Sequence, residues 1–367
     1  MRILYFTRRY TVHDQRFLTA LSTEGFEINL LILEKGTNQI KAFTQPENVS
    51  IVPWTGLKHP LNWYSGFYLQ KSLGAIVEQV KPDLIHAGPI QSCAFLSALT
   101  YFNPLVSVSW GYDLLIDADC SSINRWVTKY TLRKSDILIG DCQTIREKAI
   151  YFGMQSDRIV TFPWGIDLSR FKTTNTKQGE NGTFTLLSTR AWEPIYGVET
   201  IARAFVEAVQ EIPQLRLVML GNGSQKELLY RIFSTGNALD KVKFAGQVKQ
   251  AELPRYYQKA DLYVAATHSD GTSISLLEAL ACGTPALVSD LPGNQEWINP
   301  GIQGWLFPKG DIGGLKDSII NAWNNRDRLT EMGKSGRSIA ESRADWNKNF
   351  PKLLEAYKLA LHLAASR

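Results

Sequence analysis

The sequence predicts an α/β protein made of two Rossmann-like, doubly wound domains that face each other across an interdomain cleft. Its 367 residues exceed one ordinary core and fit two domains of about 150 to 200 residues each. Short apolar runs bounded by turn residues alternate with helical patterns, as in parallel sheets covered by helices. The polar segment KTTNTKQGENGT, 172–183, interrupts that alternation and indicates where one domain gives way to the next.

The first domain is predicted over 1–170. Its uncharged stretch 87–112 is as long as a membrane span. Glycine and proline at Gly88, Pro89 and Pro104 divide this stretch, so a buried β-α-β passage is the prediction instead. The predicted strands of this domain are 3–6, 28–33, 83–87, 105–110 and 136–140, and a helix is expected around 14–24.

After a linker at 171–183, the same pattern predicts a second domain over 184–349. Apolar residues at helical spacing then predict an amphipathic terminal helix within 350–367, which we expect to join the first domain. The predicted elements of the second domain are strands at 185–188, 215–220, 242–244, 262–264 and 286–288 and a helix at 198–209.

The charge pattern bears on the partners. A net charge of +5 suits anionic substrates such as nucleotide diphosphates, and it leaves peripheral contact with an anionic membrane open. The cations are spread along the chain, with no basic run and no interleaved aromatic and basic motif, so no nucleic-acid partner is expected.

The cysteines predict the compartment. They are far apart and show no CxxC spacing, which argues against a zinc site or a disulfide framework and for reduced thiols in a cytoplasmic protein. Peripheral placement on the inner face of the membrane is an open alternative. Acidic and imidazole residues show no spacing of a dedicated metal site either. The four cysteines are Cys93, Cys120, Cys142 and Cys282.

The segment 268–283 contains the clearest candidate site, because a polar loop precedes a predicted helix over 274–281. The first-turn amides of a helix lack intrahelical partners, and the helix dipole is positive there. The loop and the helix start at Ser273, Ile274 and Ser275 are therefore suited to hold a phosphate.

Two carboxylates flank that helix start. Glu278 lies one turn into the helix and can accept hydrogen bonds from a sugar diol, and Asp270 on the preceding loop can do the same for another sugar. Taken alone, these residues are better explained as a solvated loop acid and a helix-surface acid.

The stretch DGTSISLLEALACGTPALVSD, 270–290, with Gly293 and Glu296 downstream, resembles the signature of family 4 retaining glycosyltransferases of GT-B fold. The resemblance extends over nearly the whole chain. Supporting segments are SDILIGDCQTIREKAIYFGMQSDRIVTFPWGID, STRAWEPIYGVETIARAF, the turn Leu220-Gly221-Asn222-Gly223, and VKFAGQVKQAELPRYYQKADLYVAATH.

The resemblance implies a role for each matching residue. Glu278 would hold the nucleotide ribose, Asp270 would contact the transferred sugar, and Arg190 would grip the diphosphate. A guanidinium beside a leaving diphosphate stabilises the charge that grows there in the transition state. By itself, Arg190 is also explained as a surface cation at a strand end. The other donor-binding candidates are Tyr196, Val248, Gly271, Thr272, Ser273, Ile274 and Ser275.

The sequence departs from the family pattern at three places. The first acid of the pair is Asp270, where glutamate is commoner. Tyr196 stands where the family usually has a lysine beside the diphosphate, so one cation is missing unless Arg8, Arg9 or Arg16 of the facing domain replaces it. In Trp110-Gly111-Tyr112-Asp113, tryptophan stands where many relatives have histidine.

In consequence, Asp113 becomes a candidate catalytic residue beside Asp270 and Arg190. A carboxylate that caps a strand-to-helix turn explains Asp113 equally well.

Acceptor contacts are expected from the first domain. The candidates are His13, Arg16, His86 and Trp110, although for His86 a role in the core is also open. The first loop lacks a glycine-rich phosphate motif, which argues against a nicotinamide or flavin site. Aromatic residues in 53–72 can stack on sugars, enter a membrane interface or pack a helix on the sheet.

The expected activity is transfer of a sugar from UDP- or GDP-sugar to an acceptor hydroxyl with retention of configuration. It would serve polysaccharide, glycolipid or glycoconjugate synthesis, with a saccharide or lipid-linked acceptor. The nucleotide sugar is a co-substrate, and no further cofactor and no metal is expected. Two alternatives stay open, a nucleotide-sugar-binding protein without turnover and a GT-B sugar phosphorylase.

Overall fold

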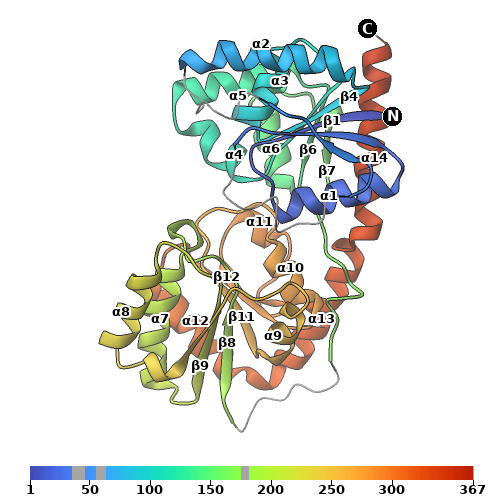
Figure 1. Ribbon diagram of the computed structural model, residues 1–367. Helices are drawn as coiled ribbons and strands as arrows, with labels where there is room; N and C mark the ends of the chain where they lie inside the picture. The colour runs from blue at the N-terminus through green and yellow to red at the C-terminus, as the bar shows by residue number, and fades with distance from the viewer. Residues whose placement is uncertain (35–45, 55–62, 175–181, 367) are drawn as a thin grey trace. The chain divides into compact units, whose positions relative to one another are not determined.

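A computed structural model describes residues 1–34, 46–54, 63–174 and 182–366 of the chain. The chain divides into two compact units, Met1–Phe162 with Phe350–Arg367, and Pro163–Asn349. Each unit consists of a parallel sheet flanked by helices (Figure 1). The predicted α/β class with two Rossmann-like domains is confirmed.

The first unit contains a seven-stranded parallel sheet in the order β3-β2-β1-β4-β5-β6-β7. All residues of β4, β5 and β6 are buried, as expected for a parallel sheet that helices cover on both faces. The strands are β1 Arg2–Thr7, β2 Glu27–Ile32, β3 Val49–Ile51, β4 Leu84–Gly88, β5 Leu105–Val108, β6 Ile137–Gly140 and β7 Ile159–Thr161.

Helices flank the sheet of the first unit. The first of them begins with a capping box in which Thr11 and Asp14 satisfy each other's backbone amides. The helices are α1 Val12–Thr23, α2 Trp63–Val80, α3 Phe95–Ala98, α4 Tyr112–Leu115, α5 Ser122–Lys134, α6 Gln143–Tyr151 and α14 Trp346–Ala365, the last of which begins in the second unit.

The second unit contains a six-stranded sheet in the order β10-β9-β8-β11-β12-β13, also parallel throughout. Helices α7, α8 and α12 pack on one face, and α9, α10 and α13 contribute to the core on the other (Figure 1).

The strands are β8 Phe184–Ser188, β9 Leu215–Leu220, β10 Val242–Gly246, β11 Leu262–Ala265, β12 Ala286–Ser289 and β13 Gly304–Phe307. The helices are α7 Val198–Glu211, α8 Lys226–Thr235, α9 Leu253–Lys259, α10 Ile274–Ala281, α11 Pro292–Gln295, α12 Ile312–Asn324 and α13 Leu329–Arg343.

Both sheets have the Rossmann strand order, which reverses direction at one point of each sheet. That point lies between β1 and β4 in the first unit and between β8 and β11 in the second. Loops that leave neighbouring strands there run to opposite sides, which opens a crevice at the carboxyl ends of the strands. The sequence stretches that follow β8 and β11 contain Arg190 and Asp270.

The boundary between the units differs from the prediction at 170. The chain enters the second unit at Pro163, because Ile166 and Phe171, each 2% exposed, pack in that unit's core. Ile166 also donates its amide to the carbonyl of Ala344, at 2.7 Å. The predicted linker 171–183 is therefore partly core of the second unit, and its residues 175–181 lie outside the described structure.

The uncharged stretch 87–112 forms the end of β4, a short helical passage through α3, and β5. In the parts of the chain that the structure describes, no helix has both the length and the apolar character that crossing a membrane requires.

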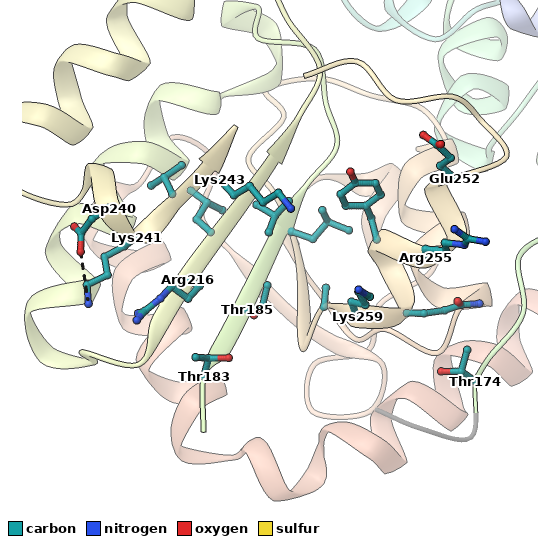
Figure 2. Close-up of a pocket in the computed structure, with 17 residues that line it drawn as sticks. Thr174, Thr183, Thr185, Arg216, Asp240, Lys241, Lys243, Glu252, Arg255 and Lys259 are labelled. Carbon is teal, nitrogen blue, oxygen red and sulfur yellow. Dashed lines mark ion pairs between the residues drawn. The ribbon is translucent and has the colours of Figure 1, made fainter. Parts of the chain in front are cut away.

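One face of β8, β9 and β10 borders a hollow of about 780 Å³ whose other wall is α9 (Figure 2). This hollow is distinct from the strand ends that contain Arg190 and Asp270.

Candidate functional site

Glycines bring the loops at the carboxyl edge of the second sheet into close contact. A Cβ at Gly197, whose φ is +60°, would lie 2.0 Å from the carbonyl oxygen of Ala266. A Cβ at Gly293 would lie 2.3 Å from the carbonyl oxygen of Gly271. Only glycine permits these approaches, so the loops after β8 and β12 lie directly against the loop after β11.

Arg190 contacts three residues of the loop after β11 and the start of α10. Its Nη2 lies 2.9 Å from Oδ2 of Asp270 in an ion pair. Its Nη1 donates to Oγ of Ser273 at 3.0 Å and to Oγ of Ser275 at 3.2 Å. The sequence-predicted residues Arg190, Asp270, Ser273 and Ser275 are thus brought together as one cluster.

The side chain of Tyr196 packs against the guanidinium of Arg190. The guanidinium carbon of Arg190 is 4.1 Å from the centroid of the Tyr196 ring, in a cation–π contact. Burial opposes the charge of Arg190, but the charge of Asp270 and the nearby hydroxyls of Tyr263 and Tyr196 outweigh it and raise its pKa. Arg190 therefore stays charged, and Tyr196 holds the plane of its guanidinium.

The start of α10 combines side-chain hydroxyls with helix amides. Ser273 is the N-cap residue, and its hydroxyl and that of Ser275 lie 3.1 Å apart. The hydroxyl of Tyr263, on β11, donates to Oγ of Ser275 at 2.9 Å. No side chain caps the amides of this helix. The uncapped amides, the dipole and Arg190 all favour a negative group here.

Glu278 is buried and held by a tyrosine. Its side chain is on the inner face of α10, the residue is 7% exposed, and Oε2 accepts a hydrogen bond from the hydroxyl of Tyr257 at 2.8 Å. That hydroxyl also lies 3.0 Å from Oγ1 of Thr189. Burial and the charge of Glu278 raise the pKa of Tyr257 well above its usual value, so the hydroxyl stays protonated.

Asp270, with 22% of its side chain exposed, is ion-paired, and Glu278 is buried, so neither is simply solvated. Sequence reasoning missed Tyr257, Tyr263 and Thr189. Each of them lies in a segment that carries the family resemblance, which is the signal that could have found them.

Val248 and a second hollow border the candidate site. Val248 follows β10 and packs, half-buried, on the core that includes α10. A hollow of about 380 Å³ borders the loop that contains Tyr196. Its lining includes Ile195, Gly197, Gln225 and His268. His268 was not predicted, and its amide donates to the carbonyl of Ile195 at 2.8 Å.

Asp113 lies in the first unit and is wholly buried. Its Oδ1 accepts from the hydroxyl of Ser109 at 2.6 Å and from the amide of Leu114 at 3.0 Å, and its Oδ2 accepts from the amide of Ile90 at 3.0 Å. Burial raises the pKa of Asp113 to about 6. The contacts favour the capping alternative over a catalytic one.

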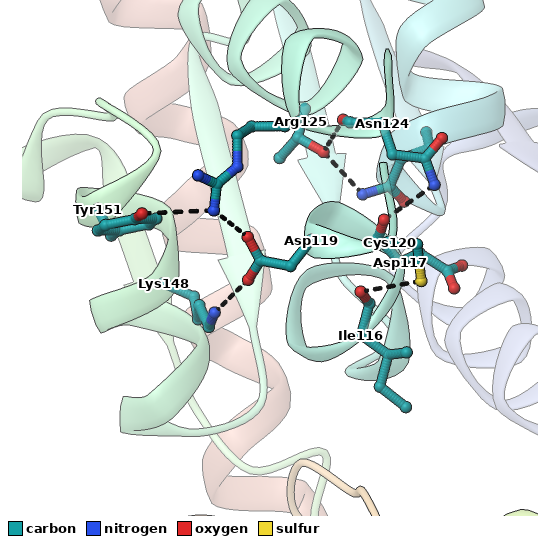
Figure 3. Close-up of polar contacts among 10 residues, drawn as sticks. Ile116, Asp117, Asp119, Cys120, Asn124, Arg125, Lys148 and Tyr151 are labelled. Carbon is teal, nitrogen blue, oxygen red and sulfur yellow. Dashed lines mark hydrogen bonds and ion pairs between the residues drawn. The ribbon is translucent and has the colours of Figure 1, made fainter. Parts of the chain in front are cut away.

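The turn that follows Asp113 is tied to two helices. Asp119 accepts from Nη2 of Arg125 on α5 at 2.5 Å and from Nζ of Lys148 on α6 at 2.6 Å (Figure 3). Asn124 also donates to the carbonyl of Asp117 at 2.8 Å. The exposed thiol of Cys120 lies in the same turn. These contacts hold the segment in place next to Asp113.

His86 is a core residue of the first unit. Its Nδ1 lies 2.7 Å from the hydroxyl of Tyr357 on α14, and its ring stacks on Tyr5 with the centroids 4.3 Å apart. Burial lowers the pKa of His86 to about 3, so the ring is neutral. Tyr5 in turn donates to Oδ1 of Asp14 at 3.1 Å. The core alternative for His86 is the one that these contacts favour.

The other acceptor candidates lie on α1 and after β5. His13 and Trp110 stack with their ring centroids 6.1 Å apart, and both are half-buried. Arg16 lies on the same helix as His13. Arg8 and Arg9 each form an ion pair of 2.7 Å with Glu34, which engages both of them within the first unit.

Over the described parts of the chain, the acidic, histidine and cysteine side chains form no group of three or more that could hold a metal ion. The four cysteines are free, and three of them are buried.

The strand order and the site define a Rossmann-type protein in which an arginine contacts a helix start at the switch point of the second sheet. Two family models match this chain. Residues 171–339 match glycosyl transferases group 1, and residues 2–144 match the glycosyl transferase 4-like family. The chain belongs to the group 1, family 4-like glycosyltransferases.

Curated relatives share part of their length with the chain. The UDP-N-acetylglucosamine–peptide N-acetylglucosaminyltransferase GtfA subunit of Streptococcus pneumoniae is 29% identical over 54% of this chain and 40% of its own length. The phosphatidyl-myo-inositol mannosyltransferase of Mycobacterium leprae is 28% identical over 45% of this chain and 44% of its own. The match thus spans less than half the length of these two relatives.

Solved structures match over the whole chain. The sucrose-phosphate synthase of Thermosynechococcus elongatus has a TM-score of 0.80 at 18% identity, covering 100% of both chains. HepE of Anabaena in complex with UDP has a TM-score of 0.79 at 17% identity, covering 98% of this chain and 100% of its own. These likenesses show the fold, and the fold is GT-B.

Proposed function

We propose that the protein transfers a sugar from a nucleotide diphosphate sugar to an acceptor hydroxyl, with retention of configuration. The observation that carries the proposal is the cluster at the start of α10. There, Arg190 lies within hydrogen-bond reach of Ser273 and Ser275, beside helix amides that no side chain caps. A diphosphate fits this combination, because a guanidinium and helix amides both stabilise anionic oxygens.

Glu278 supports a nucleotide rather than a bare diphosphate. Its Oε2 is held by Tyr257, and its other oxygen, Oε1, is the proposed acceptor for a ribose hydroxyl. Glu278 follows Ser275 by one helical turn, the spacing at which side chains lie on one face of a helix. A phosphate at the helix start and a ribose beside Glu278 are therefore adjacent positions along α10.

The proposed reaction breaks the bond between the anomeric carbon and the diphosphate oxygen. The acceptor oxygen forms its bond to the same face of the sugar, and its proton passes to the departing phosphate. Arg190 stabilises the charge that accumulates on that phosphate. Since Arg190 pairs with Asp270 at 2.9 Å, the diphosphate must take over part of this arginine as it binds. Asp270 is then available to a hydroxyl of the transferred sugar.

Tyr196 accounts for the missing lysine in this proposal. It adds no charge, but its ring lies 4.1 Å from the Arg190 guanidinium and restricts its orientation. We propose that one fixed arginine and the α10 amides supply the stabilisation for which relatives use an arginine and a lysine.

For the donor we infer a UDP-sugar ahead of a GDP-sugar. The name of the pneumococcal relative includes UDP-N-acetylglucosamine, and structures of HepE contain UDP and UDP-glucose. His13 and Trp110 of the first unit are the proposed acceptor contacts. A saccharide or a lipid-linked acceptor fits a stacked pair of rings.

A thermal-shift screen of UDP, GDP and their sugars tests the proposal, because a ligand at 100 times its Kd stabilises a protein by about 2.7 kcal/mol. We expect UDP-sugars to stabilise the protein and Glu278→Ala to abolish most of that shift. Unchanged stabilisation of Glu278→Ala would rule out the ribose assignment.

Turnover separates the alternatives. Release of UDP by the purified protein eliminates a binding protein without activity. A requirement for inorganic phosphate, with release of a sugar phosphate, would instead identify a phosphorylase.

A further inference from the structure

The hollow on the second unit breaks the burial pattern of a parallel sheet. Alternation along the strands places Thr185 and Leu187 of β8, Arg216 and Val218 of β9, and Lys243 of β10 on one face. Parallel sheets are normally covered on both faces by aliphatic side chains and helices. Here Lys243 is exposed and Arg216 half-buried, on the face of the sheet where α9 and α10 also pack, and no residue of the donor site lines the hollow.

The floor and walls of the hollow differ in character. Leu187 and Val218 pair in register across β8 and β9 and form an apolar floor, and Lys243 is the next residue in that row, on β10. Across from the strands, α9 contributes Tyr256, half-buried, with Arg255 and Lys259 exposed (Figure 2). Hydroxyls of Thr174, Thr183 and Thr185 line the same space.

Three of the cations have no counter-charge. Lys243, Arg255 and Lys259 form neither a hydrogen bond nor an ion pair through their side chains with any part of the chain that the structure describes. Arg216 donates to two backbone carbonyls, and Lys241 lies 3.9 Å from Asp240. The lining contains five cations and two acids, Asp240 and Glu252, so its net charge is positive.

We propose that this hollow is a second saccharide-binding site, which holds an anionic sugar chain bearing carboxylate, sulfate or phosphate groups. Its volume of about 780 Å³ is too large for a single phosphate and matches ligands of several rings. Lys243 on β10 and Arg255 and Lys259 on α9 can therefore bind negative groups that are spaced along a sugar chain. Threonine hydroxyls bind sugar hydroxyls, and Tyr256 with the aliphatic floor packs against the apolar face of a sugar ring.

An acidic amphipathic helix fits less well. Such a helix needs a continuous apolar groove for anchors along several turns. The floor here consists of Leu187 and Val218, with Tyr256 on one side.

The inference rests on the proposed function in one respect, that a glycosyltransferase meets sugar chains as acceptors or products. The hollow lies on the same unit as Arg190 and Glu278 but shares no lining residue with them. A chain held here would keep an acidic acceptor or product on the enzyme between transfers.

Binding of defined oligosaccharides to the full protein tests the proposal without donor or turnover. The probes are a heparin-derived hexasaccharide, a hyaluronan hexasaccharide, neutral maltohexaose and inorganic sulfate, titrated by microscale thermophoresis at fixed ionic strength. We expect at least one acidic hexasaccharide to bind more tightly than maltohexaose and sulfate. Failure of both acidic probes, or equal binding of maltohexaose or sulfate, overturns the proposal.

Variants locate the binding. An exposed ion pair is worth up to about 1 kcal/mol, so Lys243→Ser or Lys259→Ser should each weaken the acidic hexasaccharide by up to about fivefold. Lys334→Ser removes an exposed cation of α13 outside the hollow and should leave binding unchanged. Equal weakening by Lys334→Ser would show only non-specific attraction.

The donor site provides the second control. Lys243→Ser should keep the thermal shift with UDP, and Glu278→Ala should keep hexasaccharide binding. Loss of UDP binding in every experiment together with intact hexasaccharide binding would contradict the proposed function alone. Intact UDP binding together with no binding of either acidic hexasaccharide would contradict the second site alone.

Discussion

The guanidinium of Arg190 and the carboxylate of Asp270 form an ion pair of 2.9 Å at the switch point of the second sheet. The sequence resemblance assigned them to different parts of the donor, the diphosphate and the transferred sugar. In the absence of a donor, each neutralises the other. Binding of a diphosphate must therefore compete with Asp270 for Arg190.

This competition predicts that Asp270→Asn separates binding from turnover. Without the carboxylate, Arg190 is free for the diphosphate, so UDP should bind more tightly, by about fivefold if the pair is worth about 1 kcal/mol. Transfer should fall, because the proposed contact to the sugar is weakened. Calorimetric titration with UDP and an assay of UDP release measure the two effects. Weaker UDP binding with full turnover would contradict the proposed competition between the diphosphate and Asp270 for Arg190.

Tyr257→Phe tests whether the buried hydroxyl positions Glu278. Loss of one hydrogen bond to a charged group costs about 1.5 to 3 kcal/mol, so UDP affinity should fall at least about tenfold. The effect should shrink for 2′-deoxyuridine diphosphate if Glu278 accepts from that hydroxyl. Tyr256→Phe changes the neighbouring tyrosine, which lines the hollow, and should leave UDP affinity intact. An equal loss with both nucleotides would make Tyr257 merely structural.

Gly197→Ala should destabilise the second unit. The new Cβ would lie 2.0 Å from the carbonyl oxygen of Ala266, at a φ of +60°. A strained backbone alone costs about 1 to 3 kcal/mol, and the clash adds to it. Gly301→Ala is the matched control, with a φ of +83° and open space around the added Cβ. Chemical unfolding followed by tryptophan fluorescence should show the larger loss for Gly197→Ala, and equal losses would refute the close approach.

Asp113 predicts a pH dependence of stability. Burial raises its pKa in the folded state from the usual value of 3.8 to about 6. The folded protein therefore binds more protons than the unfolded chain in this range, and the free energy of unfolding should fall as pH rises from about 4 to 6. A shift of this size corresponds to about 3 kcal/mol.

Asp113→Asn should make that slope smaller, since the raised pKa values of Asp14 and Asp117 contribute to it as well, whereas Asp157→Asn, at an exposed acid of the same unit, should leave it unchanged. The measurement is the unfolding free energy of each variant across this pH range. An unchanged slope in Asp113→Asn would show that another group titrates.

The strands and helices with the strongest local signals were predictable. The helix over 274–281 was predicted at its observed bounds, because a polar loop precedes its apolar run and Gly283 follows it. Strand 215–220 stood out between turns as an apolar run that only Arg216 interrupts. The short strands β3, β7 and β13 were not predicted.

The candidate site was predictable in its charged residues and not in its hydroxyls. The resemblance assigned roles to Arg190, Asp270 and Glu278, whereas the contacts of Tyr257 with Glu278 and of Tyr263 with Ser275 come from the tertiary fold. Similarly, Phe171 was assigned to a linker because the residues that follow it are polar, but tertiary packing buries its side chain in the core of the second unit. The contact between Tyr196 and Arg190 could not be derived from residue types alone.

The central claim is that Arg190 and the start of α10 bind the diphosphate of a nucleotide sugar. The most direct measurement compares the affinities for UDP and uridine in the wild type, in Arg190→Ala and in Arg203→Ala, which removes an exposed cation of α7. The account predicts that wild type and Arg203→Ala prefer UDP strongly and that this preference collapses in Arg190→Ala. Equal affinity for UDP and uridine in the wild type, or an undiminished preference in Arg190→Ala, would contradict it.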